Sequence, residues 1–422
     1  MRHWTSLVLA GALAVATLPA TASAQAIGGT AIGPPVQSVA EAIATDATEY
    51  GARHLVPIDE AIRRLRAQEE SVVATDRLRR VYSERLAGIS IDHGPEYRIV
   101  VLLTGSEPVP EQQVWAGGMR VPIVFRTGAL ASRERIVAAL MDRQPAIRVA
   151  FPNAQGMGLD QRTGELVVLL RGEAPQPEEM IRLEQTLEAL TGVPSRISPL
   201  ERDDTNLSVD GGSRLVGVDP ADGRTYACTT GFVVTDGDRT GIVTAAHCPD
   251  TATYLGPDGR SVPLEFVEQW GIGYQDVQVH VSDEPQGPYF FADRNKRALR
   301  TLTGRRGRTS TRAGDAVCHR GETTGYSCSE VELTDFAPPG DLCAGPCTPV
   351  WVTVGGPSCR NGDSGGPVFN GTVAFGIAKG GSYVGGQCRL YYYMSTDFLP
   401  EGWSLLTADP AALPPRPSGT AG

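Results

Sequence analysis

The cysteines place the strongest constraint on how this chain of 422 residues can fold, because all eight lie in its second half. An even count behind a secretory signal peptide implies disulfide bonds made in an oxidising compartment. A zinc site is the alternative. No Cys-x-x-Cys pair is present, however, and His319 stands alone beside Cys318, so we expect neither a metal nor another cofactor. The eight are Cys228, Cys248, Cys318, Cys328, Cys343, Cys347, Cys359 and Cys388.

The first residues predict secretion. Arg2 precedes an uncharged apolar run, LVLAGALAVATL, and the small residues at 22–24 provide a cleavage point. This is the pattern of a signal peptide over 1–24, with an apolar core too short to cross a bilayer as a stable helix. An N-terminal anchor is the alternative. We therefore expect a secreted, extracellular protein.

The overall charge limits the partners. The net charge of −10 and the pI near 5.2 argue against nucleic acid or an anionic membrane as the main partner. We expect a monomer that acts on protein or peptide substrates.

The region from 25 to 207 reads as helix followed by an α+β arrangement. Residues 37–88 have helical spacing, with Pro57 at a first turn. Two rounds of strand and helix follow, the strands at 97–103, 121–125 and 164–170 and the helices beginning after Ser132 and at 177–192. These rounds predict an α+β domain with helices over a small sheet.

The region from 208 to 405 reads differently. A polar stretch at 201–213 predicts an exposed linker of the kind that proteases cut. Short strands separated by Gly, Asp and Pro turns then predict an all-β barrel or sandwich. The remaining residues, 406–422, are expected to form a flexible tail.

One serine stands out in this second half. Ser364 lies in CRNGDSGGPVFN, where it is either a nucleophile or a serine in a tight turn. A serine hydroxyl needs a base that takes its proton and a third group that orients the base. His247, at the end of an apolar strand, is the candidate base, and Asp276, at the start of an alternating strand, is the best candidate carboxylate.

These motifs resemble those of the chymotrypsin-type serine proteases. TAAHC, a following Asp in a strand and GDSGGP occur in the order His, Asp, Ser. The bacterial branch of the streptogrisins and alpha-lytic protease is the closer match, because residues 316–328 and 376–382 are similar to its disulfide-closed loop and its substrate-binding strand. The resemblance covers about 208 to 400.

The resemblance implies a double β-barrel with the site between the barrels. Ser364 would attack the peptide carbonyl, His247 would act as base and then acid, and the N–H groups of Gly362 and Ser364 would form the oxyanion hole. Substrate would bind along Ala378, Lys379, Gly380 and Gly381. The implied disulfides are Cys228–Cys248, Cys318–Cys328 and Cys359–Cys388. Cys343 and Cys347 are left over, and the sequence alone permits 105 pairings.

The family also carries a pro-region that assists folding and blocks the site until it is cut off. Residues 25–207 resemble such a region, which would serve as intramolecular chaperone and inhibitor and be removed by self-cleavage. A disulfide-tied β protein with many non-local contacts folds slowly, so such assistance makes physical sense. The alternative is an independent binding or adhesion domain.

Several residues depart from the family pattern. Asp363 requires a cationic partner, and we expect His319 or Arg320 to provide it. Gln278 stands where the family has a small residue. Lys379 stands where a serine often supports the catalytic Asp, and we expect its side chain to point outward. Gln278 and Lys379 favour the alternative of a catalytically weak or inactive protease-like binding protein. An esterase is less well supported, because GDSGGP is not the nucleophile motif of the α/β-hydrolases.

Overall fold

The structure is a computed structural model, and the signal peptide predicted over 1–24, most of the predicted linker and the end of the predicted tail lie outside the residues it describes. None of the described helices is long and apolar enough to cross a membrane. The described residues are 35–172, 175–200, 205–206, 213–218, 223–257, 259–270, 275–283, 286–339, 343, 346–356, 358–384 and 386–409.

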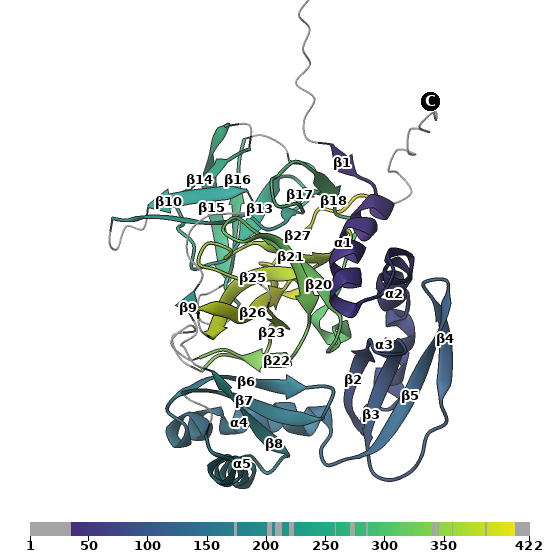
Figure 1. The fold of residues 1–422 in the computed structure, drawn as a ribbon. Helices are drawn as coiled ribbons and strands as arrows, with labels where there is room; N and C mark the ends of the chain where they lie inside the picture. The colour runs from purple at the N-terminus through teal and green to yellow at the C-terminus, as the bar shows by residue number, and fades with distance from the viewer. Residues whose placement is uncertain are drawn as a thin grey trace, which may run out of the picture. The chain divides into compact units, whose positions relative to one another are not determined.

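The α-helices of the described residues all lie in the first half (Figure 1). Ser38 caps the first helix through a capping box with Glu41. The predicted cap Ser132 is confirmed, since its side chain accepts a hydrogen bond from the N–H of Arg135. The helices are α1 (Val39–His54), α2 (Ile58–Glu70), α3 (Val72–Val81), α4 (Arg133–Ala150) and α5 (Pro177–Thr191).

The strands of the first half lie in two four-stranded sheets, whereas the sequence predicted one small sheet. The first has the order β2-β3-β5-β4 and the second the order β22-β6-β7-β8. The strand β22 (Thr334–Ala337) comes from the second half of the chain and pairs antiparallel with β6. The other strands are β2 (Leu86–Asp92), β3 (Arg98–Thr104), β4 (Gln112–Ala116), β5 (Met119–Ala129), β6 (Ala154–Asp160), β7 (Glu165–Arg171) and β8 (Ser195–Leu200).

Two glycines explain why β22 can join this sheet. A Cβ on Gly156 would meet the Phe336 ring at 2.4 Å, and a Cβ on Gly158 would lie 3.2 Å from the same residue. The ring of Phe336 therefore fits directly over β6. Phe336 also belongs to an apolar core shared with Val167 and Leu169 of β7 and with Trp351 of the second half. The two halves thus share both a sheet and a core.

The second half is rich in β structure, as the sequence predicted. One sheet runs β11-β10-β14-β15-β16-β13-β12-β27, and another follows β21-β20-β24-β25-β26-β23, with β9 and β19 pairing with β25. A small sheet of order β1-β18-β17 completes the described strands. Their bounds are β1 (Val36–Gln37), β9 (Thr205–Asn206), β10 (Arg214–Val218), β11 (Thr225–Thr229), β12 (Val233–Thr235), β13 (Thr240–Thr244), β14 (Ala252–Leu255), β15 (Ser261–Trp270), β16 (Val277–Val281), β17 (Tyr289–Phe291), β18 (Leu299–Thr301), β19 (Gly304–Arg305), β20 (Ala316–Gly321), β21 (Gly325–Glu330), β23 (Val352–Gly355), β24 (Pro367–Asn370), β25 (Val373–Val384), β26 (Gln387–Ser395) and β27 (Ser404–Leu405).

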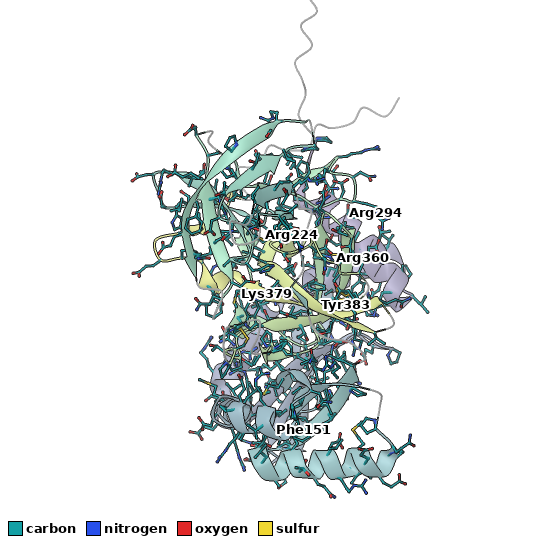
Figure 2. All side chains as sticks on the ribbon, turned by 90° about the vertical axis from the view of Figure 1, so that its left-hand side faces the viewer. Phe151, Arg224, Arg294, Arg360, Lys379 and Tyr383 are labelled. Atoms are coloured by element: carbon teal, nitrogen blue, oxygen red, sulfur yellow. A yellow bond between two sulfur atoms is a disulfide. The ribbon has the colours of Figure 1, made fainter. Side chains whose placement is uncertain are left out.

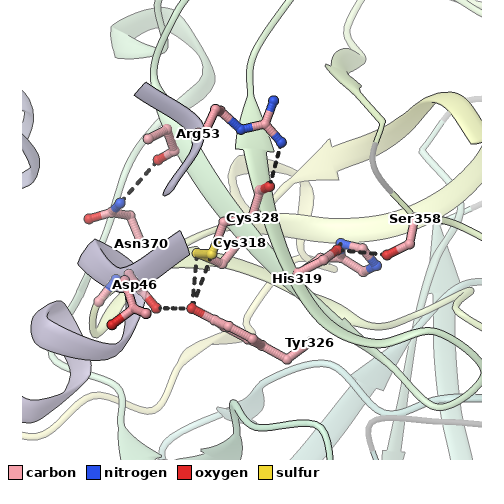
Figure 3. Close-up of a disulfide and its surroundings, with 12 residues drawn as sticks. Asp46, Arg53, Cys318, His319, Tyr326, Cys328, Ser358 and Asn370 are labelled. Atoms are coloured by element: carbon pink, nitrogen blue, oxygen red, sulfur yellow. Dashed lines mark hydrogen bonds between the residues drawn. A yellow bond between two sulfur atoms is a disulfide. The ribbon is translucent and has the colours of Figure 1, made fainter. Parts of the chain in front are cut away.

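Helices α1 and α2 dock on the second half through buried polar groups. Asp46 accepts a hydrogen bond from the hydroxyl of Tyr326 at 2.6 Å, beside the Cys318–Cys328 disulfide (Figure 3). The side-chain amide of Gln68 exchanges hydrogen bonds with the backbone of Ala316, at 3.0 and 2.6 Å. Buried polar groups are costly to leave without a hydrogen-bond partner. These hydrogen bonds therefore hold α1 and α2 on the strands β20 and β21.

Candidate active site

His247 lies just after β13, in a loop that is fixed by a disulfide and by a backbone hydrogen bond. The disulfide Cys228–Cys248 joins the residue after His247 to β11. The N–H of His247 itself donates to Oδ1 of Asp276 at 2.8 Å. The backbone of His247 is therefore tied to the same carboxylate that its ring contacts.

The structure brings His247, Asp276 and Ser364 together in one hydrogen-bonded set. Nδ1 of His247 lies 2.8 Å from Oδ2 of Asp276 and 3.1 Å from Oδ1. Nε2 lies 2.9 Å from Oγ of Ser364. The Asp276 side chain is 0% exposed and that of His247 is 11% exposed, so the carboxylate is shielded while the imidazole reaches the surface. Serine, histidine and aspartate thus contact one another in the order that a serine-based acyl transfer would require.

The carboxylate of Asp276 is ionised in spite of its burial. Burial acts to raise its pKa, but the charges and hydrogen bonds of His247 and Lys379 outweigh that cost and hold the pKa well below its ordinary value. The residue also has a left-handed backbone, with a φ of 48°, at the start of β16. A buried anion is therefore available to orient the imidazole and to stabilise its protonated form.

Lys379 points inward, so the sequence-based expectation that its side chain points outward is wrong. Its Nζ lies 2.8 Å from Oδ2 of Asp276, and its side chain is 1% exposed. The physical reason is a β-bulge: in the pairing of β25 with β26, Ala378 opposes Tyr393 and Gly380 opposes Tyr392, which leaves Lys379 as the extra residue. Figure 2 labels Lys379 on the yellow strand β25.

The loop of Ser364 depends on glycine and on Thr229. Gly362 has a φ of 112° and Gly365 one of 84°, values that side chains rarely adopt. A Cβ on Gly365 would also lie 2.1 Å from the carbonyl oxygen of Thr229. Thr229 donates its N–H to the carbonyl of Ser364 at 2.6 Å and its hydroxyl to the carbonyl of Gly362 at 2.9 Å. Thr229 is thus a site residue that the motif itself did not reveal.

The carboxylate of Asp363 accepts hydrogen bonds from the loop between β20 and β21 and from its own turn. Its carboxylate accepts from the N–H groups of Thr323 and Thr324, from the hydroxyl of Thr324 at 2.7 Å and from the N–H of Arg360 at 2.9 Å. Several hydrogen bonds to one carboxylate stabilise its charged form.

The hypothesis that His319 pairs with Asp363 as a cation is wrong. Nε2 of His319 lies 3.3 Å from the hydroxyl of Thr324, which in turn contacts Asp363, and Nδ1 lies 3.3 Å from the hydroxyl of Ser327. Burial lowers the pKa of His319, against the opposing influence of Asp363, so the ring is neutral near pH 7. Arg320, the other candidate, forms an ion pair with Glu322 at 3.1 Å.

Gln278 braces the histidine loop. Its side chain is buried, and its Nε2 donates to the carbonyl of Cys248 at 3.2 Å. The residue faces Thr244 across the pairing of β16 with β13. Gln278 is larger than the small residue expected at this position. Its amide is held by a hydrogen bond to the loop that carries His247.

The strand expected to bind substrate is already paired at one place. Ala378, Lys379, Gly380 and Gly381 lie in β25, and the carbonyl of Lys379 is 3.1 Å from Oγ of Ser364. The short strand β9 pairs antiparallel with this segment, Asn206 opposite Gly380 and Thr205 opposite Gly381. Residues 205 and 206 thus run antiparallel to this strand, close to the carbonyl that contacts Ser364.

The cysteines pair as the family resemblance implied. The structure contains Cys228–Cys248, Cys318–Cys328 and Cys359–Cys388. The two cysteines left over from that set, Cys343 and Cys347, pair with each other. Both are buried in the apolar cluster of α4 and the sheet β22-β6-β7-β8, so this last bridge lies against the first half.

Two clusters bring together groups of the kind that bind metals. In the first, His54, His93 and Glu330 approach one another, but His93 already contacts the hydroxyl of Tyr50 through Nδ1 and the carbonyl of Gly314 through Nε2, at 2.6 and 2.7 Å. A ring nitrogen that donates to a carbonyl offers no lone pair to an ion. In the second, Asp46 lies beside Cys318 and Cys328, which are joined in a disulfide and so are not thiolate ligands.

Comparisons with known proteins match part of the chain. Streptogrisin-C of Streptomyces griseus is 28% identical over 163 residues, which are 38% of this chain and 33% of the relative, so the match spans about a third of that protein's length. No family model matches the chain.

Among solved structures, Protease A of Thermobifida fusca is 24% identical, with 47% of this chain and 99% of that one covered and a TM-score of 0.38. The Nocardiopsis protease NAPase is 22% identical, with 40% and 86% covered and a TM-score of 0.33. The sequence match to Streptogrisin-C confirms the resemblance first indicated by the TAAHC and GDSGGP motifs, that of a bacterial chymotrypsin-like serine protease.

Proposed function

We propose that this chain is a secreted serine endopeptidase that hydrolyses peptide bonds through His247, Asp276 and Ser364. The observation that carries the proposal is the continuous set of contacts from Asp276 Oδ2 to His247 Nδ1 and from His247 Nε2 to Ser364 Oγ, at 2.8 and 2.9 Å. An adjacent base that is itself held by a third group is the arrangement that activates a serine hydroxyl as a nucleophile in this way.

The proposed reaction follows from these positions. Oγ of Ser364 attacks the carbonyl carbon of the scissile peptide while Nε2 of His247 takes its proton. The same nitrogen then returns the proton to the leaving amine, which gives an acyl-enzyme and the first product. Water, activated by His247, hydrolyses the ester and restores the serine. Asp276 holds the ring in the tautomer with Nδ1 protonated and stabilises the imidazolium in both halves of the reaction.

The oxyanion that forms in each half would be bound by the N–H groups of Gly362 and Ser364. Donors aimed at the developing charge are the largest single contribution in this class of reaction. The hydrogen bonds from Thr229 to the carbonyls of Gly362 and Ser364 support this role, because they fix the loop that carries both donors.

We further propose that residues 25–207 are a pro-region, that residues 208–405 are the protease domain and that the enzyme processes itself. The antiparallel pairing of Thr205–Asn206 with Gly380–Gly381 supports this, because an extended peptide substrate would add to the same strand. Processing is expected in the residues that follow Asn206, within 207–213. The contacts of α1 and α2 with the second half fit a role of this region in assisting folding, and the pairing of residues 205 and 206 with β25 fits a role in blocking the site.

The test compares the secreted wild-type protein with a Ser364→Ala variant. Intact mass and N-terminal sequencing should find a cut within 207–213 in the wild type and the uncut pro-protein in the variant. Peptide substrates should be hydrolysed by the wild type alone. Wild-type protein that stays uncut and inactive would contradict the proposal.

A catalytically weak or inactive protease-like binding protein is the second candidate. The contact of Lys379 with Asp276 favours it, because a cation beside the carboxylate weakens the base. The two candidates differ in a measurable way. The binding protein would retain affinity for peptides with Ser364 replaced and would show no turnover with Ser364 present.

A further inference from the structure

Lysine is rare in this chain, and one of its two copies lies behind the proposed triad. Of 38 basic residues, only Lys296 and Lys379 are lysines and the rest are arginines. Lysine carries a compact charge on a flexible stem, whereas arginine presents a wide planar fork. The position behind Asp276 therefore holds the basic side chain that occupies the smaller volume.

The bulge in β25 gives Lys379 two separate contacts with the site. Its backbone carbonyl lies 3.1 Å from Oγ of Ser364, and its ammonium lies 2.8 Å from Oδ2 of Asp276. That oxygen is also the one that Nδ1 of His247 contacts at 2.8 Å. The base and the lysine therefore share a single carboxylate oxygen.

Aromatic groups form the other side of the lysine pocket. Nζ lies 4.9 Å from the centre of the Trp351 ring, and Tyr392 packs edge-on against that ring at 6.0 Å. A cation over an aromatic face is stabilised without a second carboxylate. The charged and titratable groups named around the pair are Asp276, from the loop before β16, His247, from the loop after β13, Lys379 of β25 and the phenol of Tyr392 in β26.

We propose that Lys379 is a positioning residue that lets the enzyme work at a lower pH than a triad of His, Asp and Ser alone. The inference rests on the proposed function. The ammonium offsets part of the negative charge of Asp276, so the carboxylate attracts a proton onto the imidazole less strongly.

The kinetic test uses Lys379→Gln, which keeps a hydrogen-bond donor for Asp276 and removes the charge. In a profile of kcat/KM against pH, the acid limb of this variant should move upward by about one pH unit. Lys379→Arg should return the limb towards that of the wild type. Lys296→Met is the matched control at the other lysine and should leave the limb in place. Identical acid limbs for Lys379→Gln and the wild type would overturn the proposal.

A second measurement separates this inference from the proposed activity. In the uncut Ser364→Ala protein labelled with ¹⁵N-histidine, the titration midpoint of His247 is read by NMR with and without Lys379→Gln. An upward shift in the variant supports the proposal even if the wild type shows no peptidase activity, which would count against the proposed function only. If Lys379→Gln and Lys379→Met both fail to fold while Lys379→Arg folds, the lysine is only a structural ion pair and the proposal is wrong.

Discussion

Asp46 of α1 and Arg300 of β18 form a buried ion pair that ties the first half of the chain to the second. Nη2 of Arg300 lies 2.8 Å from Oδ1 of Asp46, and the side chains of Arg300 and Asp46 are 0% and 1% exposed. Asp46 also accepts the N–H of Gly371 at 2.6 Å, and the guanidinium lies 5.1 Å from the centre of the Phe369 ring. Each partner would be costly to bury alone.

We predict that Asp46→Ala lowers the free energy of unfolding of the uncut Ser364→Ala protein by about 3–5 kcal/mol, because Arg300 would remain buried without its counter-charge. Denaturant unfolding followed by tryptophan fluorescence measures the change. Asp59→Ala is the matched control, since the Asp59 side chain is 72% exposed and its ion pair with Arg63 lies on the surface. A change of less than about 0.5 kcal/mol for Asp46→Ala would show that the pair is not essential to the contact between the halves.

Asp276→Asn tests the orienting carboxylate. An amide cannot hold the imidazole in the productive tautomer, so kcat on a peptide substrate should fall by about 10⁴-fold. Steady-state kinetics, with circular dichroism as a check on folding, measure the loss. Retention of most of the activity would mean that another carboxylate orients His247.

Thr229→Val should lower kcat by about fivefold with little change in KM, since one hydrogen bond that fixes the loop of Gly362 and Ser364 is lost while the volume is kept. Thr225→Val, at the exposed start of the same strand, is the control and should behave as wild type. An equal effect of the two substitutions would argue against a role for the Thr229 hydroxyl.

His280 should make stability depend on pH. Burial alone lowers its pKa from 6.5 to about 4, and neither ring nitrogen has a hydrogen-bond partner among the described residues. The unfolded chain therefore binds a proton that the folded chain does not, so the stability is fully present above about pH 6.5 and is lost as the pH falls towards 4. The loss is of the order of 3 kcal/mol.

His280→Leu should flatten this dependence, and near pH 5 it should raise the free energy of unfolding of the uncut Ser364→Ala protein. Urea unfolding at pH 5 and pH 7.5 measures both effects. The same pH dependence in the variant and the parent protein would mean that His93, whose pKa burial also lowers to about 4, accounts for the acid sensitivity.

The sequence predicted the elements and residues whose signals are local. Helical spacing located α4 and α5, and the order of TAAHC, Asp276 and GDSGGP pointed to three residues that the structure brings within hydrogen-bond distance. Lys379 was misjudged because its direction depends on a bulge, which arises only when β25 is paired with β26. The pairing of β22 with β6 was not predicted for a similar reason, since nothing near Thr334–Ala337 indicates a partner strand about 175 residues earlier in the chain.

The place of β22 in the sheet also bears on synthesis. The ribosome delivers β6, β7 and β8 long before residues 334–337, so the growing chain carries β6 as an open edge until more than a hundred further residues have emerged. An exposed edge is a template for pairing with other chains. The nascent protein should therefore need protection from aggregation during that interval, and chains that terminate before residue 334 should be the ones that associate.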